Sequence, residues 1–161
     1  MRYINKIIIH CTANRPGQNP TVDDIRAAHK ANGWRDIGYH YVVYRDGSVH
    51  PGRPVSQAGA HCYGHNNHSI GVAYVGGLDV HGAPEDTRTP EQIQALRQLI
   101  VKLITMYRCD VWGHRDMSDD KNGDGKITPE EYVKDCPCFN AHDEYHKYYE
   151  SIVLRVTQTV K

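Results

Sequence analysis

The pattern of apolar and polar residues predicts short buried strands separated by amphipathic helices. The apolar run KIII, residues 6–9, predicts a buried strand that ends at His10. The stretch SIGVAYVGG, residues 69–77, predicts a second strand of small residues closed by two glycines. DVWGH, residues 110–114, predicts a third strand that ends at His114. Two histidines are therefore expected at strand ends, where a sheet can direct side chains into a shared cleft.

A first helix is predicted in TVDDIRAAHKANGW, residues 21–34. Thr21 is placed to cap its N-terminus, with Asp24 at the third helical position. Gly33 is placed to end it.

A longer helix is predicted to begin at Thr89 and Pro90, because a capping threonine followed by proline is typical of helix N-termini. Apolar residues then recur at helical spacing: Ile93, Leu96, Ile100, Leu103 and Tyr107. The stretch from Asn140 to Val156 predicts a final helix.

A hairpin is predicted in GYHYVVYRDGSVH, residues 38–50. Two β-rich runs flank Asp46-Gly47, a pair that favours a type I′ turn. Strands interleaved with helices indicate an α/β fold, and the hairpin makes the central sheet mixed. We expect one domain over residues 1–161, with helices flanking that sheet.

Composition excludes several classes of protein. The 161 residues suit one domain, and the formal net charge of zero shows no basic excess for nucleic-acid binding. No apolar run approaches the ~20 residues that a membrane span needs. The apolar run before His10 is too short for a signal peptide. We therefore expect a soluble monomer, made in the cytoplasm without a signal peptide, that binds neither nucleic acid nor membrane.

The cysteines are an odd set of five: Cys11, Cys62, Cys109, Cys136 and Cys138. An odd number without a signal sequence argues against a disulfide framework and for thiols with separate roles.

His10 and His114, together with a thiol from KDCPCF (residues 134–139), are candidate metal ligands. Two histidines and one cysteine around an open fourth position form a catalytic zinc arrangement. The spacings are long and nine other histidines compete, so any of these residues could instead be an ordinary core or surface histidine. The residues alone also leave open which of the two thiols in KDCPCF would bind.

Five blocks of sequence occur in a recognisable order: IIIHCTAN, WRDIGYHYVVYRDGSVHPGRP, GAHCYGHNNHSIGVAYVGG, GHRD and KDCPCF. Together they resemble the zinc-dependent N-acetylmuramoyl-L-alanine amidases of type 2, most closely the amidase-type phage lysozymes. Peptidoglycan-recognition proteins share that fold. The likeness covers roughly residues 5–140. It implies an enzyme that cleaves the amide between N-acetylmuramic acid and L-alanine in peptidoglycan.

The resemblance implies His10, His114 and Cys136 as zinc ligands. The pattern Lys-x-Cys-Pro-x-Phe begins at Lys134, so its ligand position is Cys136. Cys138 falls at a variable position and is expected to be a small buried residue.

The resemblance also implies catalytic roles for Tyr39 and Lys134 and substrate contact for His61. Ordinary alternatives are a cross-strand aromatic for Tyr39 and a solvated surface charge for Lys134. His65 and His68 are expected to be exposed loop residues.

Residues 120–131, DKNGDGKITPEE, match a calcium-loop pattern that the family resemblance does not explain. The expected calcium ligands are Asp120, Asn122, Asp124, the Lys126 carbonyl and Glu131. Gly125 supplies the sharp turn. The alternative is an Asx-rich turn without metal. We interpret residues 119–131 as an insertion in which structural Ca²⁺ positions the third zinc ligand.

A non-catalytic peptidoglycan-binding module is the alternative to the amidase, but such members typically lack the cysteine ligand. A calcium sensor is disfavoured, because the first helix and the partner loop are missing. An amidase of this kind would reach the cell wall after lysis or by a dedicated export route.

Overall fold

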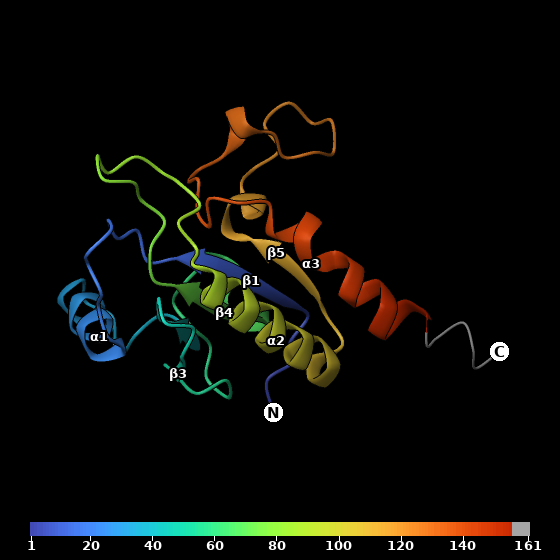
Figure 1. The fold of residues 1–161 in the computed structure, drawn as a ribbon. Coiled ribbons are helices and arrows are strands. Elements are labelled where there is room, and N and C mark those ends of the chain that lie inside the picture. The colour runs from blue at the N-terminus through green and yellow to red at the C-terminus, as the bar shows by residue number, and fades with distance from the viewer. Residues whose placement is uncertain (156–161) are drawn as a thin grey trace.

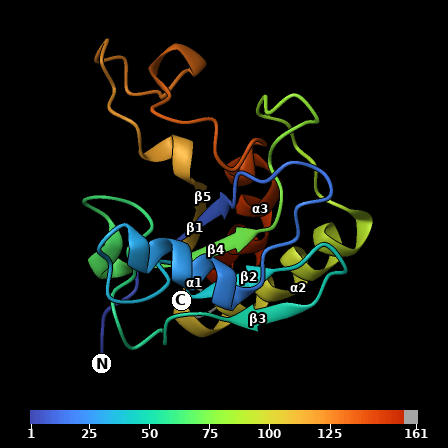
Figure 2. The ribbon, with the colours of Figure 1, turned by 90° about the vertical axis from the view of Figure 1, so that its left-hand side faces the viewer.

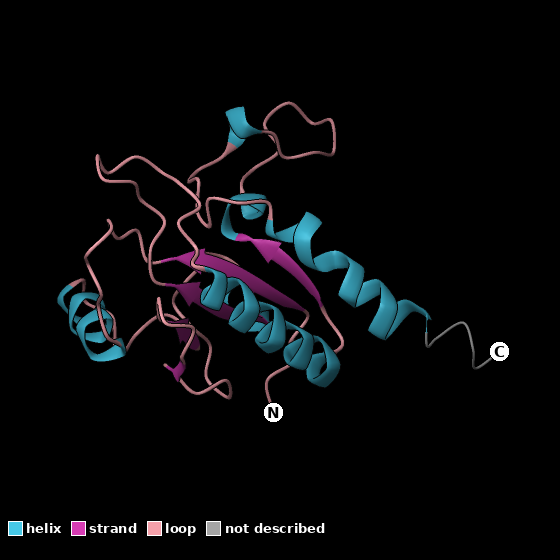
Figure 3. Cartoon of the chain, in the orientation of Figure 1, coloured by secondary structure: helices cyan, strands magenta, loops and turns pink. Residues whose placement is uncertain are grey.

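The structure is a computed structural model that describes residues 1–155, and its centre is a five-stranded mixed sheet (Figures 1 and 3). The strands are β1 (Lys6–Cys11), β2 (Tyr41–Val43), β3 (Val49–Pro51), β4 (Ser69–Tyr74) and β5 (Asp110–Gly113). Their order across the sheet is β3-β2-β4-β1-β5. β1 pairs in parallel with β4 and β5, β2 in parallel with β4, and β3 antiparallel to β2. The predicted mixed α/β sheet is confirmed.

The helices cover both faces of this sheet (Figures 1 and 2). α2 (Pro90–Tyr107) and α3 (Ala141–Tyr149) pack on one face, against Ile7 and Ile9 of β1. α1 (Val22–Ala31) packs on the other, where Val22 and Ile25 meet Val42. Because both faces of β1 are covered, its sequence is a continuous apolar run rather than an alternation of apolar and polar residues.

Side chains of β1 point alternately to the two faces. Cys11 joins Ile7 and Ile9 in the core beneath α2 and α3. His10, one residue earlier, therefore faces the side that carries α1. Its side chain is only 1% exposed. The strand extends one residue beyond the predicted end, so His10 lies within the parallel ladder, opposite Ala73.

Capping side chains fix the starts of the helices. The Thr21 hydroxyl accepts from Asp24 N–H, and the Asp24 carboxylate accepts from Thr21 N–H, as predicted. Thr89 and Gln92 form the same reciprocal cap at α2. Such pairs satisfy amides that have no partner within the helix.

The final helix differs from the prediction. Asn140 caps α3, which is regular only to Tyr149 and continues as a π-helical turn over Glu150–Leu154. Val156 lies outside the described residues.

The hairpin is present, but its predicted type I′ turn is wrong. Gly47 has a φ of +85°, whereas Asp46 is not among the residues with positive φ. Tyr44 N–H donates to Ser48 O, and Gly47 N–H donates to Tyr44 O. This is a three-residue loop closed by a glycine bulge. A Cβ on Gly47 would approach the Glu91 carbonyl oxygen at 2.8 Å, so the first turn of α2 helps to fix the loop.

One position of the apolar series in α2 is exposed rather than buried. Ile93 is 40% exposed, although Leu96, Ile100 and Leu103 of the same apolar series are buried.

No helix within residues 1–155 combines the length and apolar character that a membrane crossing requires.

Gln92 is a fully buried polar residue that ties α2 to the sheet. Its side-chain amide donates to the carbonyls of Val43 and Val75, at 3.2 and 3.0 Å. Its side-chain oxygen accepts from Thr89 N–H at 3.0 Å. One side chain thus joins the helix cap to the ends of β2 and β4.

We expect Gln92→Leu to lower the free energy of unfolding by about 1–3 kcal/mol, because it leaves buried backbone groups unpaired. Urea unfolding measures the change. Gln94→Leu makes the same substitution on the exposed face of α2 and should have little effect. Equal losses in the two variants would show that the buried hydrogen bonds are not the cause.

Candidate active site and metal centre

The parallel pairing of β1 and β5 brings two predicted ligands together. His10 lies near the C-terminal end of β1, and His114 directly follows β5 as the first residue of a 3₁₀ turn, His114–Met117. Their ring centroids are 4.7 Å apart. His10 Nδ1 lies 3.8 Å from Cys136 Sγ. One donor atom from each of these three residues lies within 4.8 Å of the others.

Backbone contacts hold the Cys136 segment against the strand ends. Cys11 N–H donates to Cys136 Sγ at 3.2 Å, and Arg115 N–H donates to the Cys136 carbonyl at 2.8 Å. The Tyr74 hydroxyl donates to the carbonyl of Pro137, which follows a cis peptide bond. A Cβ on Gly113 would lie 2.8 Å from the Pro137 ring, so this close packing requires glycine.

Cys138 points elsewhere. Its Sγ lies 3.9 Å from Cys11 Sγ and 3.3 Å from the Gly77 carbonyl oxygen. It is half-buried and does not belong to the donor group of His10, His114 and Cys136. In the sequence, only the register of the Lys-x-Cys-Pro-x-Phe pattern selected Cys136 over Cys138. The geometry favours the same cysteine, Cys136.

A chain of hydrogen bonds sets the tautomer of His10. The Ser69 hydroxyl donates to the His65 carbonyl at 2.7 Å, so Ser69 Oγ can only accept from His61 Nε2, at 3.2 Å. His61 Nδ1 is then an acceptor, and His10 Nε2–H donates to it at 2.8 Å. The remaining nitrogen of His10, Nδ1, keeps its lone pair and is the one that faces Cys136.

Two glycines leave room for the His61 ring. A Cβ on Gly71 would lie 2.5 Å from His61 Cγ, and one on Gly59 would lie 2.6 Å from His61 Cδ2. The backbone amides of His61 and Cys62 both donate to Asn66 Oδ1. His61 is therefore held by packing and by hydrogen bonds on both ring nitrogens.

Burial keeps the two candidate histidine ligands neutral. It lowers the pKa of His10 well below its usual value, with further contributions from His61, His114 and Lys134. Burial and then Lys134 lower the pKa of His114 to about 4. Neutral imidazoles are the form that binds metals. The Cys11 thiol and burial raise the pKa of Cys136, and a bound cation would oppose that effect.

Tyr39 and Lys134 line the same hollow as the donor group. A cavity of about 190 Å³ is lined by Tyr39, Trp34, Lys134 and the three donor residues, among others. A neighbouring hollow of about 410 Å³ shares Trp34, His61, His114 and Lys134 with it. The Tyr39 ring is 5.3 Å from His10, and burial raises the pKa of its hydroxyl. The Lys134 side chain is exposed.

The three histidines of residues 61–68 differ in their surroundings. His61, predicted to contact substrate, lines the cavity, but it is only 7% exposed and is bonded to His10. Its substrate contact stays a prediction. His68 is exposed as expected, whereas His65 is half-buried, with Nδ1 3.5 Å from Lys6 Nζ. Ser69 was not predicted, because its position in a strand of small residues carries no signal of a polar network.

The predicted calcium loop projects from the body of the domain (Figure 1). Asp120 accepts the amides of Gly123 and Gly125, and Glu131 accepts those of Lys121, Asn122 and Thr128. Gly125 has the expected positive φ, +81°. The described residues include two groups of three close metal donors, and the loop carboxylates form neither. The calcium ligands therefore stay a prediction.

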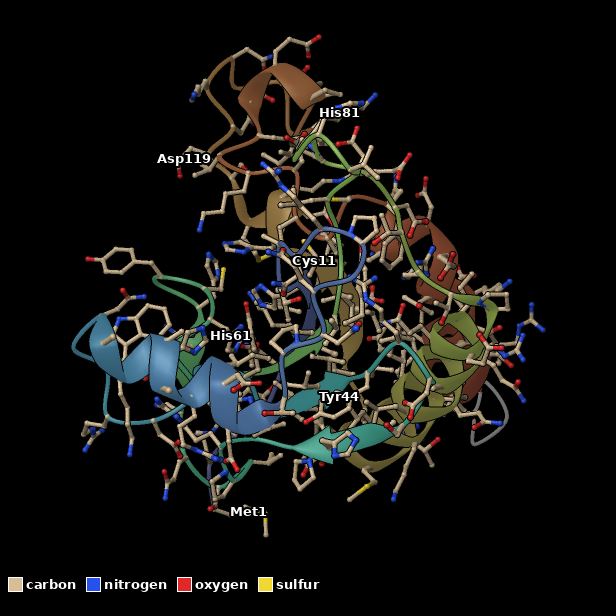
Figure 4. The ribbon with its side chains drawn as sticks, turned by 60° about the vertical axis from the view of Figure 1, so that its left-hand side comes forward. Met1, Cys11, Tyr44, His61, His81 and Asp119 are labelled. Atoms are coloured by element: carbon tan, nitrogen blue, oxygen red, sulfur yellow. The ribbon has the colours of Figure 1, made fainter. Side chains whose placement is uncertain are left out.

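Figure 4 shows the side chains around Cys11 and His61, where this site lies. Comparisons with known proteins agree with it. Residues 1–131 match the family model described as N-acetylmuramoyl-L-alanine amidase. The endolysin of Enterobacteria phage T3 is 44% identical over 113 residues, covering 70% of this chain and 75% of the relative. That of Escherichia phage T7 is 46% identical over 101 residues, covering 63% and 67%.

Solved structures point the same way. The N-acetylmuramoyl-L-alanine amidase LysC from Clostridium intestinale is similar with a TM-score of 0.69 and 26% identity, covering 93% of this chain and 85% of its own. The chain belongs to the N-acetylmuramoyl-L-alanine amidase family, as predicted, and it is a hydrolase of that class. The family match ends before Lys134 and Cys136, so their placement comes from the structure.

We expect His61→Phe to weaken Zn²⁺ binding by about 10–100-fold, because it removes the acceptor that fixes the His10 tautomer. Chelator competition measures the affinity, and circular dichroism checks that the domain still folds. His68→Phe is the matched control on the exposed side of the same loop. Unchanged affinity in His61→Phe would exclude this orienting role.

Proposed function

We propose that the chain hydrolyses the amide between N-acetylmuramic acid and L-alanine of peptidoglycan, with zinc as its metal. One observation carries the proposal: two neutral imidazoles and a thiol converge beside an open cavity that Tyr39 and Lys134 also line. The family and the phage endolysin relatives support the same reaction.

The donor set fits zinc better than a hard cation. Imidazole nitrogen and thiolate sulfur are preferred zinc ligands, whereas Ca²⁺ and Mg²⁺ take oxygen. His10, His114 and Cys136 would hold the ion and leave one position open toward the cavity. Zinc in such a site lowers the pKa of water to about 7 and polarises a carbonyl oxygen.

Tyr39 and Lys134 contribute different groups. Because burial raises its pKa, the Tyr39 hydroxyl stays protonated at neutral pH and can donate a hydrogen bond to a group in the cavity. The Lys134 ammonium stands at the mouth shared by the two hollows. There it can stabilise the negative charge that develops on the amide oxygen during attack.

A binding module without catalysis is the alternative. Peptidoglycan-recognition proteins are among the relatives, at about 30% identity. The complete donor set, with a tyrosine and a lysine beside it, favours the enzyme. We further propose that the chain acts as a monomer on the cell wall after lysis or export.

Loss of the sulfur ligand tests both the reaction and the metal. We expect Cys136→Ser to retain one zinc equivalent fewer than the wild type and to release almost no new L-alanine amino termini from purified peptidoglycan, with the fold retained. Cys138→Ser is the matched control and should keep both. A zinc content in Cys136→Ser equal to that of the wild type would transfer the ligand role to another residue.

Lys134 is expected to act on the transition state alone. Lys134→Ala should lower kcat by roughly 10²–10³-fold, as for loss of one oxyanion donor, without changing zinc content. Tyr39→Phe, which removes only the hydroxyl, should also lower kcat with zinc retained. Steady-state kinetics and metal analysis measure both, with Lys121→Ala as a surface control. Normal turnover in Lys134→Ala would leave that residue as a solvated charge.

We also propose that the loop at residues 120–131 takes up one structural Ca²⁺, since its sequence meets every ligand position of the pattern. Bound Ca²⁺ should raise the melting temperature by mass action and slow the loss of zinc to a chelator. Asp120→Ala combined with Glu131→Ala should abolish both effects. If calorimetry gives no heat signal at millimolar Ca²⁺, the loop is an Asx-rich turn without metal.

A further inference from the structure

A second cluster of donor side chains lies where α3 runs alongside the edge strand β5 (Figure 1). Asp110 opens β5, and His142 and His146 stand four residues apart on α3. One donor atom from each lies within 4.8 Å of the others. Neither the amidase reaction nor the family resemblance uses these residues.

The donor atoms are already close to ligand spacing. His146 Nδ1 lies 2.7 Å from Asp110 Oδ2, and His142 Nδ1 lies 4.0 Å from the same oxygen. With metal–ligand bonds of about 2.1 Å, tetrahedral ligands stand about 3.4 Å apart. The two separations bracket that value, so small side-chain shifts would suffice to enclose an ion.

Both histidines are held in place by their surroundings. The His142 ring stacks on Trp112 with centroids 3.9 Å apart and planes 4° from parallel. Its Nδ1–H donates to the Val111 carbonyl at 2.9 Å, and an ion bound at Nδ1 would replace that proton and its hydrogen bond. The exposed fractions of the two imidazoles, 26% for His142 and 34% for His146, leave the cluster open to solvent.

Glu150 contacts the second ring nitrogen of His146 from outside the donor cluster. Its carboxylate lies 3.5 Å from His146 Nε2, on the opposite side of the ring from Asp110. Metal-bound histidines commonly direct their second nitrogen at a carboxylate, which fixes the tautomer and raises ligand basicity. Because Asp110 can only accept, a proton occupies the short contact with His146 Nδ1. A metal ion at that point would take the place of the proton.

We propose that Asp110, His142 and His146 bind one divalent transition-metal ion of the zinc type. Two imidazoles and one carboxylate suit zinc and its neighbours, whereas calcium and magnesium prefer all-oxygen sites. The ion would join α3 to β5, the strand that leads into His114. The site is separate from the cavity, and its occupancy does not depend on amidase activity.

Counting Zn²⁺ tests the proposal. The wild-type chain should retain two equivalents after gel filtration, and His142→Ala or His146→Ala should retain one with amidase activity preserved. Cys136→Ser should also retain one, at the second cluster. Glu150→Gln should weaken the second equivalent by about 10-fold, as expected for an outer partner. His81→Ala, a substitution of an exposed histidine, should retain two.

Trp112 offers a local readout, because the chain has only one other tryptophan, Trp34. In a Trp34→Phe, Cys136→Ser protein, one equivalent of Cu²⁺ should quench the remaining fluorescence. Adding His146→Ala should abolish that quenching at one equivalent. A single zinc equivalent in the wild type, or two in His146→Ala, would overturn the proposal and leave Asp110–His146 as an ion pair that fastens the helix.

Discussion

The parallel pairing of β1 with both β4 and β5 is the constraint on which the site depends. Parallel strands end at the same edge of a sheet, so His10 and His114 meet although they are far apart in the sequence. The same edge receives the Cys136 segment, which bonds to the ends of β1, β4 and the turn after β5. A change in strand register would reverse the side of the sheet that His10 faces.

Burying polar groups at this edge is costly unless each finds a partner. The chain Ser69–His61–His10 pairs three of the four ring nitrogens of its two histidines, and the fourth, His10 Nδ1, faces Cys136. His40 is also buried with both ring nitrogens paired. Its Nδ1 accepts from Gly71 N–H, its Nε2–H donates to the Gln57 carbonyl, and burial lowers its pKa to about 4. The hydrogen-bonded scaffold therefore both supports the sheet and prepares the donor atoms.

The regular elements were predictable because local physics determines them. Thr21 with Asp24, and Thr89 with Pro90, mark helix starts through amides that need partners, and the structure confirms both. The turn at Asp46-Gly47 was predicted with the wrong type, since nearby packing of Gly47 against α2 also shapes it. Ile93 belongs to the apolar series that predicted α2, yet it is 40% exposed, because helical spacing does not show which positions a neighbouring element covers.

The sequence by itself determined the fold class, the family and the candidate ligands, since ordered motifs and apolar periods are local properties. Only the tertiary structure decided how donors converge. It placed Cys136 rather than Cys138 beside the histidines, and it revealed His61 as a partner of His10. It also brought Asp110 to His146, a meeting that no spacing indicates. Distances between residues remote in sequence follow from strand pairing and packing, and those are set by the whole chain at once.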